Sequence, residues 1–174
     1  MREAQVTGKQ LGMLAAGGSA ILLLAAFVFQ ALGYAPCAMC IWQRYPHGVA
    51  IAAGALLAVG LSPIGLLVVG ASAAATTSAI GVYHTGVERD WWQGPTSCTG
   101  SGLDLSNLSG SDLLPSASSG PSTLVMCDEV AWEFLTLSMA SWNALWSSAL
   151  VVLWLVAFAR EWQHRQAQST YSAT

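Results

Sequence analysis

The sequence predicts an all-α membrane protein, a single-domain bundle of four transmembrane helices over residues 1–174. The first observation is composition: the chain is 54% hydrophobic and only 9% charged, with a mean hydropathy of +0.53. Soluble domains carry about 25% charged residues, so this chain has too little charge to cover a surface in water. The second is a series of long uncharged runs, and the third is an uneven distribution of basic residues around them.

The first uncharged run covers about residues 11–32. At 1.5 Å per residue it is long enough to cross the apolar core of a bilayer. It is too long for the apolar region of a signal peptide, and we expect an uncleaved first span. A short polar segment follows over residues 33–47 and contains Pro46. This proline either begins the second span or kinks it, and the sequence leaves both possibilities open.

The uncharged stretch over residues 48–82 is too long for one span and is interrupted by Ser62-Pro63. Proline removes a helix donor and disfavours helical geometry in the residue before it. We therefore expect a tight hairpin of two spans, at about 46–61 and 64–82.

A long polar segment over residues 83–138 separates the third span from the last. It holds seven of the nine acidic residues and many Gly, Ser and Pro residues. Loops of this length are usually functional or mobile. The last span is expected at about 141–159, followed by a tail over 160–174.

The basic residues predict which side of the membrane each segment occupies. Four lie in the two chain ends and two lie in the connecting loops: Arg2, Lys9, Arg160 and Arg165 against Arg44 and Arg89. Because cytoplasmic segments are enriched in Lys and Arg, both termini are expected in the cytoplasm and both polar loops outside it. The net charge of −3 argues against nucleic-acid binding, which requires a basic surface.

All four cysteines fall in the two outer loops, Cys37 and Cys40 in the first and Cys98 and Cys127 in the second. Outside the cytoplasm disulfides form and persist. The Cys37-x-x-Cys40 spacing allows a small disulfide ring that opens readily, and a nearby helix N-terminus lowers a thiol pKa. These features predict redox-active thiols.

Three other side chains near the outer face are candidates for this chemistry. Arg44 lies one turn past Cys40 if the helix has begun there, and its charge favours a thiolate. His84 lies at the outer end of the third span, where it could bind a quinone carbonyl or carry a proton. Each has a simpler alternative, contact with lipid headgroups, which also applies to His47.

Other roles for the cysteines remain to be weighed. Two permanent disulfides could simply stabilise the protein. A four-cysteine zinc site is disfavoured, because Cys98 and Cys127 lack the close spacing of a second C-x-x-C, and no metal is expected. Covalent haem attachment is excluded, because Ile41 and not histidine follows Cys40.

Several segments together resemble one family, disulfide bond formation protein B (DsbB), and they cover the chain from the first span to the fourth. They are Pro36–Arg44, Tyr83–Glu88, Trp92–Pro95 before Cys98, Cys127–Glu129, Trp132, Phe134, Leu137–Met139 and Trp142-Asn143. The resemblance implies a bacterial inner-membrane oxidoreductase that reoxidises a periplasmic DsbA-type thioredoxin-like protein and passes the electrons to ubiquinone or menaquinone.

The resemblance also implies residue roles. A Cys98–Cys127 disulfide would be attacked by the soluble partner, and Cys98 would carry the mixed disulfide. The released Cys127 would attack Cys37, which leaves Cys40 as a thiolate facing the quinone.

Two further side chains have implied roles at the quinone. Arg44 would stabilise the thiolate and the reduced quinone. His84 matches by position a histidine that lines the quinone site in the family.

Two alternatives to this function are considered. Vitamin K epoxide reductase-like enzymes also combine a four-helix bundle, a quinone and paired cysteines, but their C-x-x-C lies late in the chain, whereas here it follows the first span. The other alternative is a non-catalytic membrane protein with structural disulfides, whose cysteines would not respond to quinone.

Overall fold

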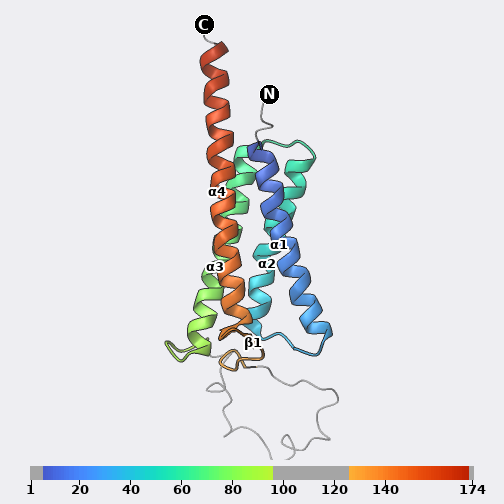
Figure 1. Cartoon of the computed structure of the whole chain (residues 1–174), viewed down its shortest axis with the longest axis vertical. Coiled ribbons are helices and arrows are strands. Elements are labelled where there is room, and N and C mark those ends of the chain that lie inside the picture. The colour runs from blue at the N-terminus through green and yellow to red at the C-terminus, as the bar shows by residue number, and fades with distance from the viewer. Residues whose placement is uncertain (1–5, 96–125, 173–174) are drawn as a thin grey trace, which may run out of the picture.

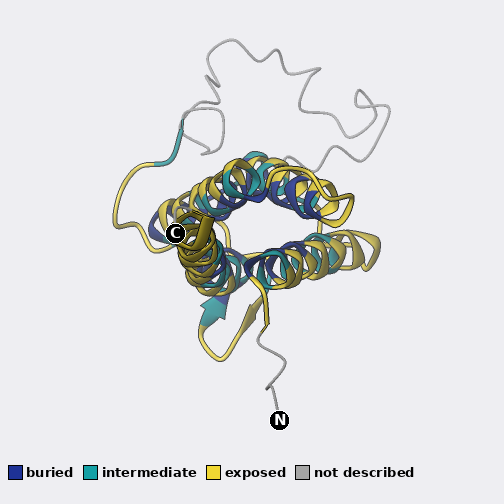
Figure 2. Cartoon of the chain, turned by 90° about the horizontal axis from the view of Figure 1, so that it is seen from above, coloured by how far each residue is buried: buried dark blue, intermediate teal, exposed yellow. Residues whose placement is uncertain are grey.

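Four helices form a bundle in the computed structural model, which describes residues 6–95 and 126–172. Each helix packs mainly against two neighbours: α1 and α3 both contact α2 and α4 (Figure 1, Figure 2). The elements are α1 (Gly8–Ala31), α2 (Ala38–Ala58), α3 (Pro63–Glu88), β1 (Glu133–Phe134), β2 (Leu137–Ser138) and α4 (Met139–Ser172). The predicted all-α four-helix bundle is confirmed, with one short antiparallel β-hairpin, β1 and β2, before α4.

Local sequence explains where the helices begin. At α1, the Thr7 hydroxyl caps the backbone N–H of Gln10, and the Gln10 side chain accepts from the Thr7 N–H. At α2, Cys37 is the N-cap and its sulfur accepts from the Cys40 N–H. Pro63 occupies the first turn of α3, where its missing N–H costs nothing. Pro46 lies inside α2, so it neither begins the helix nor ends it.

The helices extend beyond the uncharged runs that suggested them. Helix α2 already begins at Ala38, inside the C-x-x-C, and α3 continues through the polar residues up to Glu88. Helix α4 runs on to Ser172, because no glycine or proline follows its apolar part. Hydropathy marks the apolar part of a helix, whereas breakers and caps decide where the helix ends.

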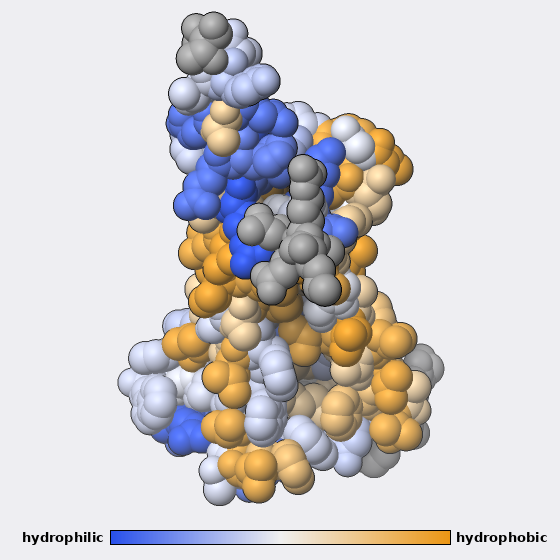
Figure 3. Space-filling view, turned by 45° about the horizontal axis from the view of Figure 1, so that its top comes forward, coloured by the Kyte–Doolittle hydropathy of each residue, from blue (hydrophilic) through white to orange (hydrophobic). Residues whose placement is uncertain are grey.

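Within residues 6–95 and 126–172, three helices, α1, α3 and α4, are long and apolar enough to cross a membrane. Helix α2 is less apolar, because its first half carries Gln43, Arg44 and His47. Apolar side chains cover the middle of the bundle, and polar ones gather where α4 projects beyond it (Figure 3). Helix α1 begins and α4 ends at one end of the bundle, whereas the β-hairpin lies at the other (Figure 1).

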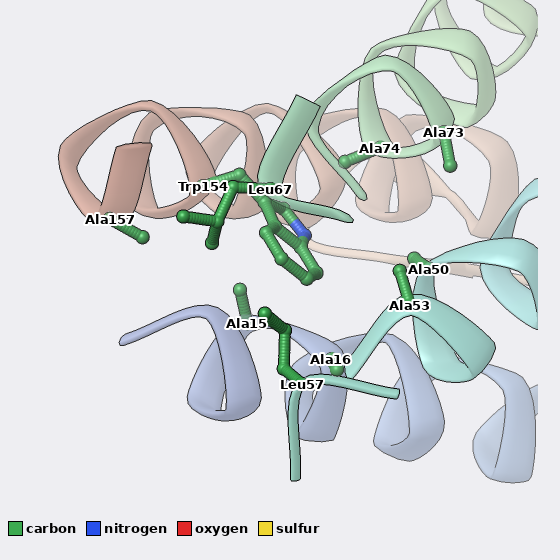
Figure 4. Close-up of a cluster of buried hydrophobic side chains, with 10 residues drawn as sticks. All are labelled: Ala15, Ala16, Ala50, Ala53, Leu57, Leu67, Ala73, Ala74, Trp154 and Ala157. Atoms are coloured by element: carbon green, nitrogen blue, oxygen red, sulfur yellow. The ribbon is translucent and has the colours of Figure 1, made fainter. Parts of the chain in front are cut away.

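Small side chains fill the contacts between helices, which lets the backbones approach closely. A Cβ added at Gly54 would lie 2.2 Å from the Ala16 Cβ, and one at Gly70 would lie 2.5 Å from the Trp154 ring. Trp154 is completely buried and is the largest side chain of the core (Figure 4). The other core residues are mostly alanines: Ala15, Ala16, Ala50, Ala53, Leu57, Leu67, Ala73, Ala74 and Ala157.

Candidate active site: a thiol centre at one end of the bundle

A pocket of about 430 Å³ lies at the end of the bundle that carries the C-x-x-C. Its walls come from α1, the first half of α2, the end of α3, the segment before α4 and the start of α4. Cys37, Cys40, Arg44, His84 and Glu88 all line it. A mostly apolar pocket with a few converging polar groups is the usual form of a small-molecule site.

The two sulfurs of the C-x-x-C lie in contact at the start of α2. The Cys37 thiol donates a hydrogen bond to Cys40 Sγ at 3.1 Å, and the Cys40 N–H donates to Cys37 Sγ at 3.3 Å. The hydrogen bond to Cys40, together with burial, raises the pKa of Cys37 to about 12. In the reduced pair Cys37 therefore keeps the proton, and Cys40 is the sulfur placed to carry the negative charge.

Cys127, from the second polar loop, lies directly beside this pair. It is completely buried and packs with Cys37, Met39 and Val87. Its sulfur lies within 4.8 Å of both Cys37 Sγ and a ring nitrogen of His84. The fold thus brings cysteines of the two loops together, as disulfide exchange between them requires. Cys98 lies outside the described residues.

His84 and Glu88 lie one turn apart on α3, and both face the Cys37 side of the site. His84 Nε2 is 3.6 Å from Cys37 Sγ and 3.8 Å from Glu88 Oε1. Glu88 is buried and accepts a hydrogen bond from the Ser138 hydroxyl. His84 is 2% exposed, so it is not a headgroup contact. His84 instead lies beside the Cys37 sulfur, a contact that the sequence did not suggest.

Arg44 lies on the pocket wall and reaches across to α1. Its Nη1 donates to Gln30 Oε1 at 2.7 Å, its Nη2 donates to the Ala26 carbonyl at 3.4 Å, and its guanidinium lies 4.9 Å from the centre of the Phe27 ring. Its Nε is buried and has no hydrogen-bond partner among the residues that the structure describes. The guanidinium is thus held in place with its Nε–H left unpaired.

A buried polar network continues from His84 into the bundle and joins α2, α3 and α4. Its members are Gln43, His47, Thr77, His84, Asn143 and Ser147. Gln43, Asn143 and Glu88 had not been singled out from the sequence. A signal was present, because polar side chains inside apolar helices are costly and usually functional, and Glu88 follows His84 by one turn.

The chain matches the family of disulfide bond formation protein DsbB over residues 8–157. It is 34% identical over 141 residues to disulfide bond formation protein B of Aromatoleum aromaticum, covering 78% of this chain and 82% of that protein. It is 30% identical over 157 residues to disulfide bond formation protein B of an Acidovorax species, with 86% of each chain covered. No solved structure shows significant similarity to it. The chain therefore belongs to the DsbB family of disulfide bond formation enzymes, multi-pass proteins of the inner membrane that reoxidise DsbA through a quinone.

Proposed function

We propose that Cys98, Cys127, Cys37 and Cys40 form a thiol relay on the periplasmic face of the membrane. It takes two electrons from a reduced DsbA-type protein and delivers them to a quinone in the pocket beside Cys40. The observation that carries the proposal is the position of Cys127, whose sulfur lies within 4.8 Å of Cys37 Sγ.

Electrons enter by attack on the loop disulfide. A thiolate of the soluble partner attacks Cys98 in a Cys98–Cys127 disulfide, which forms a partner–Cys98 bond and releases Cys127 as a thiolate. Cys127 then attacks Cys37 in the Cys37–Cys40 disulfide. A Cys37–Cys127 bond forms, the Cys37–Cys40 bond breaks, and its electron pair stays on Cys40.

The start of α2 favours Cys40 as the leaving sulfur. Cys40 lies in the first turn of the helix, where unpaired backbone N–H groups stabilise negative charge. Cys37 is the N-cap outside that turn and is the sulfur next to Cys127. The geometry therefore supports attack at Cys37 and departure of Cys40, not the reverse order.

The pocket fits a quinone ring. Its volume of about 430 Å³ lies in the range of small-molecule sites, and apolar side chains such as Leu22, Phe29 and Trp132 line most of it. Bound ubiquinone or menaquinone supplies the capacity to accept two electrons and two protons. Arg44, which lines the pocket and has an unpaired Nε, would hold a quinone oxygen, and Cys40 would face the ring.

Reconstitution tests this function directly. The purified protein is mixed with a reduced thioredoxin-like dithiol protein and a soluble quinone analogue, and quinone absorbance is followed. We expect catalytic quinone reduction that is lost in Cys40→Ser. Cys127→Ser should accumulate a disulfide-linked adduct between Cys98 and the soluble protein, visible on a non-reducing gel. Cysteines that stay oxidised whether quinone is supplied or withheld would instead show structural disulfides.

A further inference from the structure

The two ring nitrogens of His84 face different neighbours. Nε2 lies toward Cys37 Sγ and Glu88, whereas Nδ1 lies 3.1 Å from Gln43 Nε2. A neutral imidazole carries one proton, and the nitrogen that holds it is set by the hydrogen bond at the other. The orientation of the Gln43 amide therefore decides whether Cys37 faces an N–H or a lone pair.

A backbone carbonyl fixes the nitrogen end of the Gln43 amide. Gln43 Nε2 lies 3.2 Å from the Met39 carbonyl oxygen, which can only accept a hydrogen bond. The same nitrogen lies against His84 Nδ1. With the amide turned over, two oxygens would face each other in a buried site, since Gln43 is only 6% exposed.

A second backbone carbonyl, that of Gln43 itself, independently fixes the position of the oxygen in the Gln43 side-chain amide. The Thr77 hydroxyl donates to the Gln43 backbone carbonyl at 3.1 Å, so Thr77 Oγ1 must accept from Asn143 Nδ2, also at 3.1 Å. Asn143 Nδ2 therefore carries the amide protons, and it donates to Gln43 Oε1 at 2.7 Å. The hydrogen bonds at the nitrogen and at the oxygen of the Gln43 amide therefore both require that its nitrogen donates to His84 Nδ1.

We infer that Gln43 is a positioning residue that holds the proton of neutral His84 on Nε2 and so directs an N–H at the Cys37 sulfur. Its consequence for turnover rests on the proposed function. The second thiolate of the soluble partner first attacks the partner–Cys98 disulfide, which forms the partner's own disulfide and releases Cys98 as a thiolate. Cys98 then attacks Cys127 in the Cys37–Cys127 disulfide, so that a Cys98–Cys127 bond forms and the Cys37–Cys127 bond breaks. The electron pair stays on Cys37, and the His84 N–H stabilises that charge without giving up its proton.

The same proton keeps metal ions out of the thiol centre. Cys37, His84 and Cys127 hold their donor atoms within 4.8 Å of one another, a two-cysteine, one-histidine set that suits zinc. A histidine that binds metal through Nε2 donates its Nδ1–H to an acceptor. Here the neighbour of Nδ1 is an amide donor, which opposes that tautomer. The Gln43 amide thus disfavours metal binding by Cys37, His84 and Cys127 and leaves these residues available for thiol exchange.

Nitrogen-15 NMR of histidine-labelled protein tests the assignment, with His84→Asn identifying the His84 signals. In the wild type, Nε2 should carry the proton and Nδ1 should be bare. Gln43→Glu, measured at alkaline pH, should move the proton to Nδ1, and Gln43→Met should give a mixture. Trp42→Phe, a change at the half-exposed neighbour, is the control that keeps the wild-type pattern. A proton on Nδ1 in the wild type, or an Nε2 proton retained in both variants, overturns the inference.

Metal binding gives a second readout. With the cysteines reduced, Cd²⁺ is titrated and cadmium–thiolate absorbance is recorded. We expect Gln43→Glu to bind Cd²⁺ about tenfold or more tightly than the wild type, the usual effect of a carboxylate behind a ligating histidine. Equal affinities would overturn the exclusion of metal. Neither readout needs turnover, so a protein with the expected tautomer and no quinone reduction would refute the proposed function alone.

Discussion

At the scale of single residues, the C-x-x-C is an unequal pair. Cys37 donates its thiol proton to Cys40, and this hydrogen bond with burial raises the Cys37 pKa to about 12. Cys40 lies inside the first helical turn and Cys37 lies just outside it. Two sulfurs three positions apart therefore differ in acidity and in position, as the proposed roles of point of attack and leaving group require.

This inequality predicts a pH-dependent order of alkylation in the reduced protein. A group with a raised pKa stays protonated at neutral pH and ionises only as the pH approaches the raised value. Iodoacetamide should therefore modify Cys40 at pH 7 to 8, while modification of Cys37 should keep rising toward about pH 12. Peptide mass mapping after timed quenching measures both rates. Faster modification of Cys37 than of Cys40 at neutral pH would contradict the assigned roles.

Arg44 is the residue whose removal should weaken quinone binding. Hydrogen bonds from charged donors contribute roughly 1.5–3 kcal/mol, so Arg44→Met should raise the quinone concentration for half-maximal rate by about tenfold or more. Steady-state rates against quinone concentration give this value. Arg165→Met removes an exposed cation from α4 beyond the bundle and should leave it unchanged. If the two variants had the same effect, Arg44 would only connect α2 to α1 and would not bind the quinone.

At the scale of elements, the sequence was informative about helices and less so about their ends. Uncharged runs and Ser62-Pro63 were enough to predict four helices with a tight connection after the second. They did not show α2 beginning at Ala38, because the polar residues Gln43, Arg44 and His47 separate its first turn from the uncharged run. The roles of Gln43 and Asn143 depend on partners 41 to 100 positions away, which no local pattern shows, whereas Glu88 follows His84 by one helical turn and could have been found from the sequence.

Two glycines of α3 should respond oppositely to the same substitution. A Cβ at Gly70 would lie 2.5 Å from the Trp154 ring, whereas one at Gly65 would meet nothing within 4 Å. Overpacking a tight contact costs roughly 1–3 kcal/mol, while alanine favours an exposed helix by up to about 1 kcal/mol. Gly70→Ala should therefore lower the midpoint of thermal unfolding in detergent, and Gly65→Ala should keep or raise it. An unchanged midpoint for Gly70→Ala would show that Trp154 moves aside freely, and an equal loss in both variants would show that the Trp154 contact is not its cause.

At the scale of the whole molecule, the bundle concentrates its redox groups at one end. The C-x-x-C, His84 and Glu88 line one pocket with Cys127 packed against Cys37, and the opposite end holds the start of α1 and the polar extension of α4 (Figure 1). An even number of crossings between the two loops is expected to put both thiol couples on the same side of the membrane. The proposed relay would then pass electrons inward without any thiol crossing the bilayer.

The side that each end faces is the last prediction. In a cysteine-free background, Glu129→Cys lies by the pocket and Ser172→Cys lies at the exposed end of α4. Because basic residues favour the cytoplasm, a membrane-impermeant maleimide should label Glu129→Cys in intact spheroplasts, and Ser172→Cys only after lysis. The comparison needs no enzymatic activity, and lysed samples control for reactivity. Labelling of Glu129→Cys only after lysis would remove the thiol couples from their expected compartment, and with it the route by which a periplasmic dithiol protein reaches Cys98.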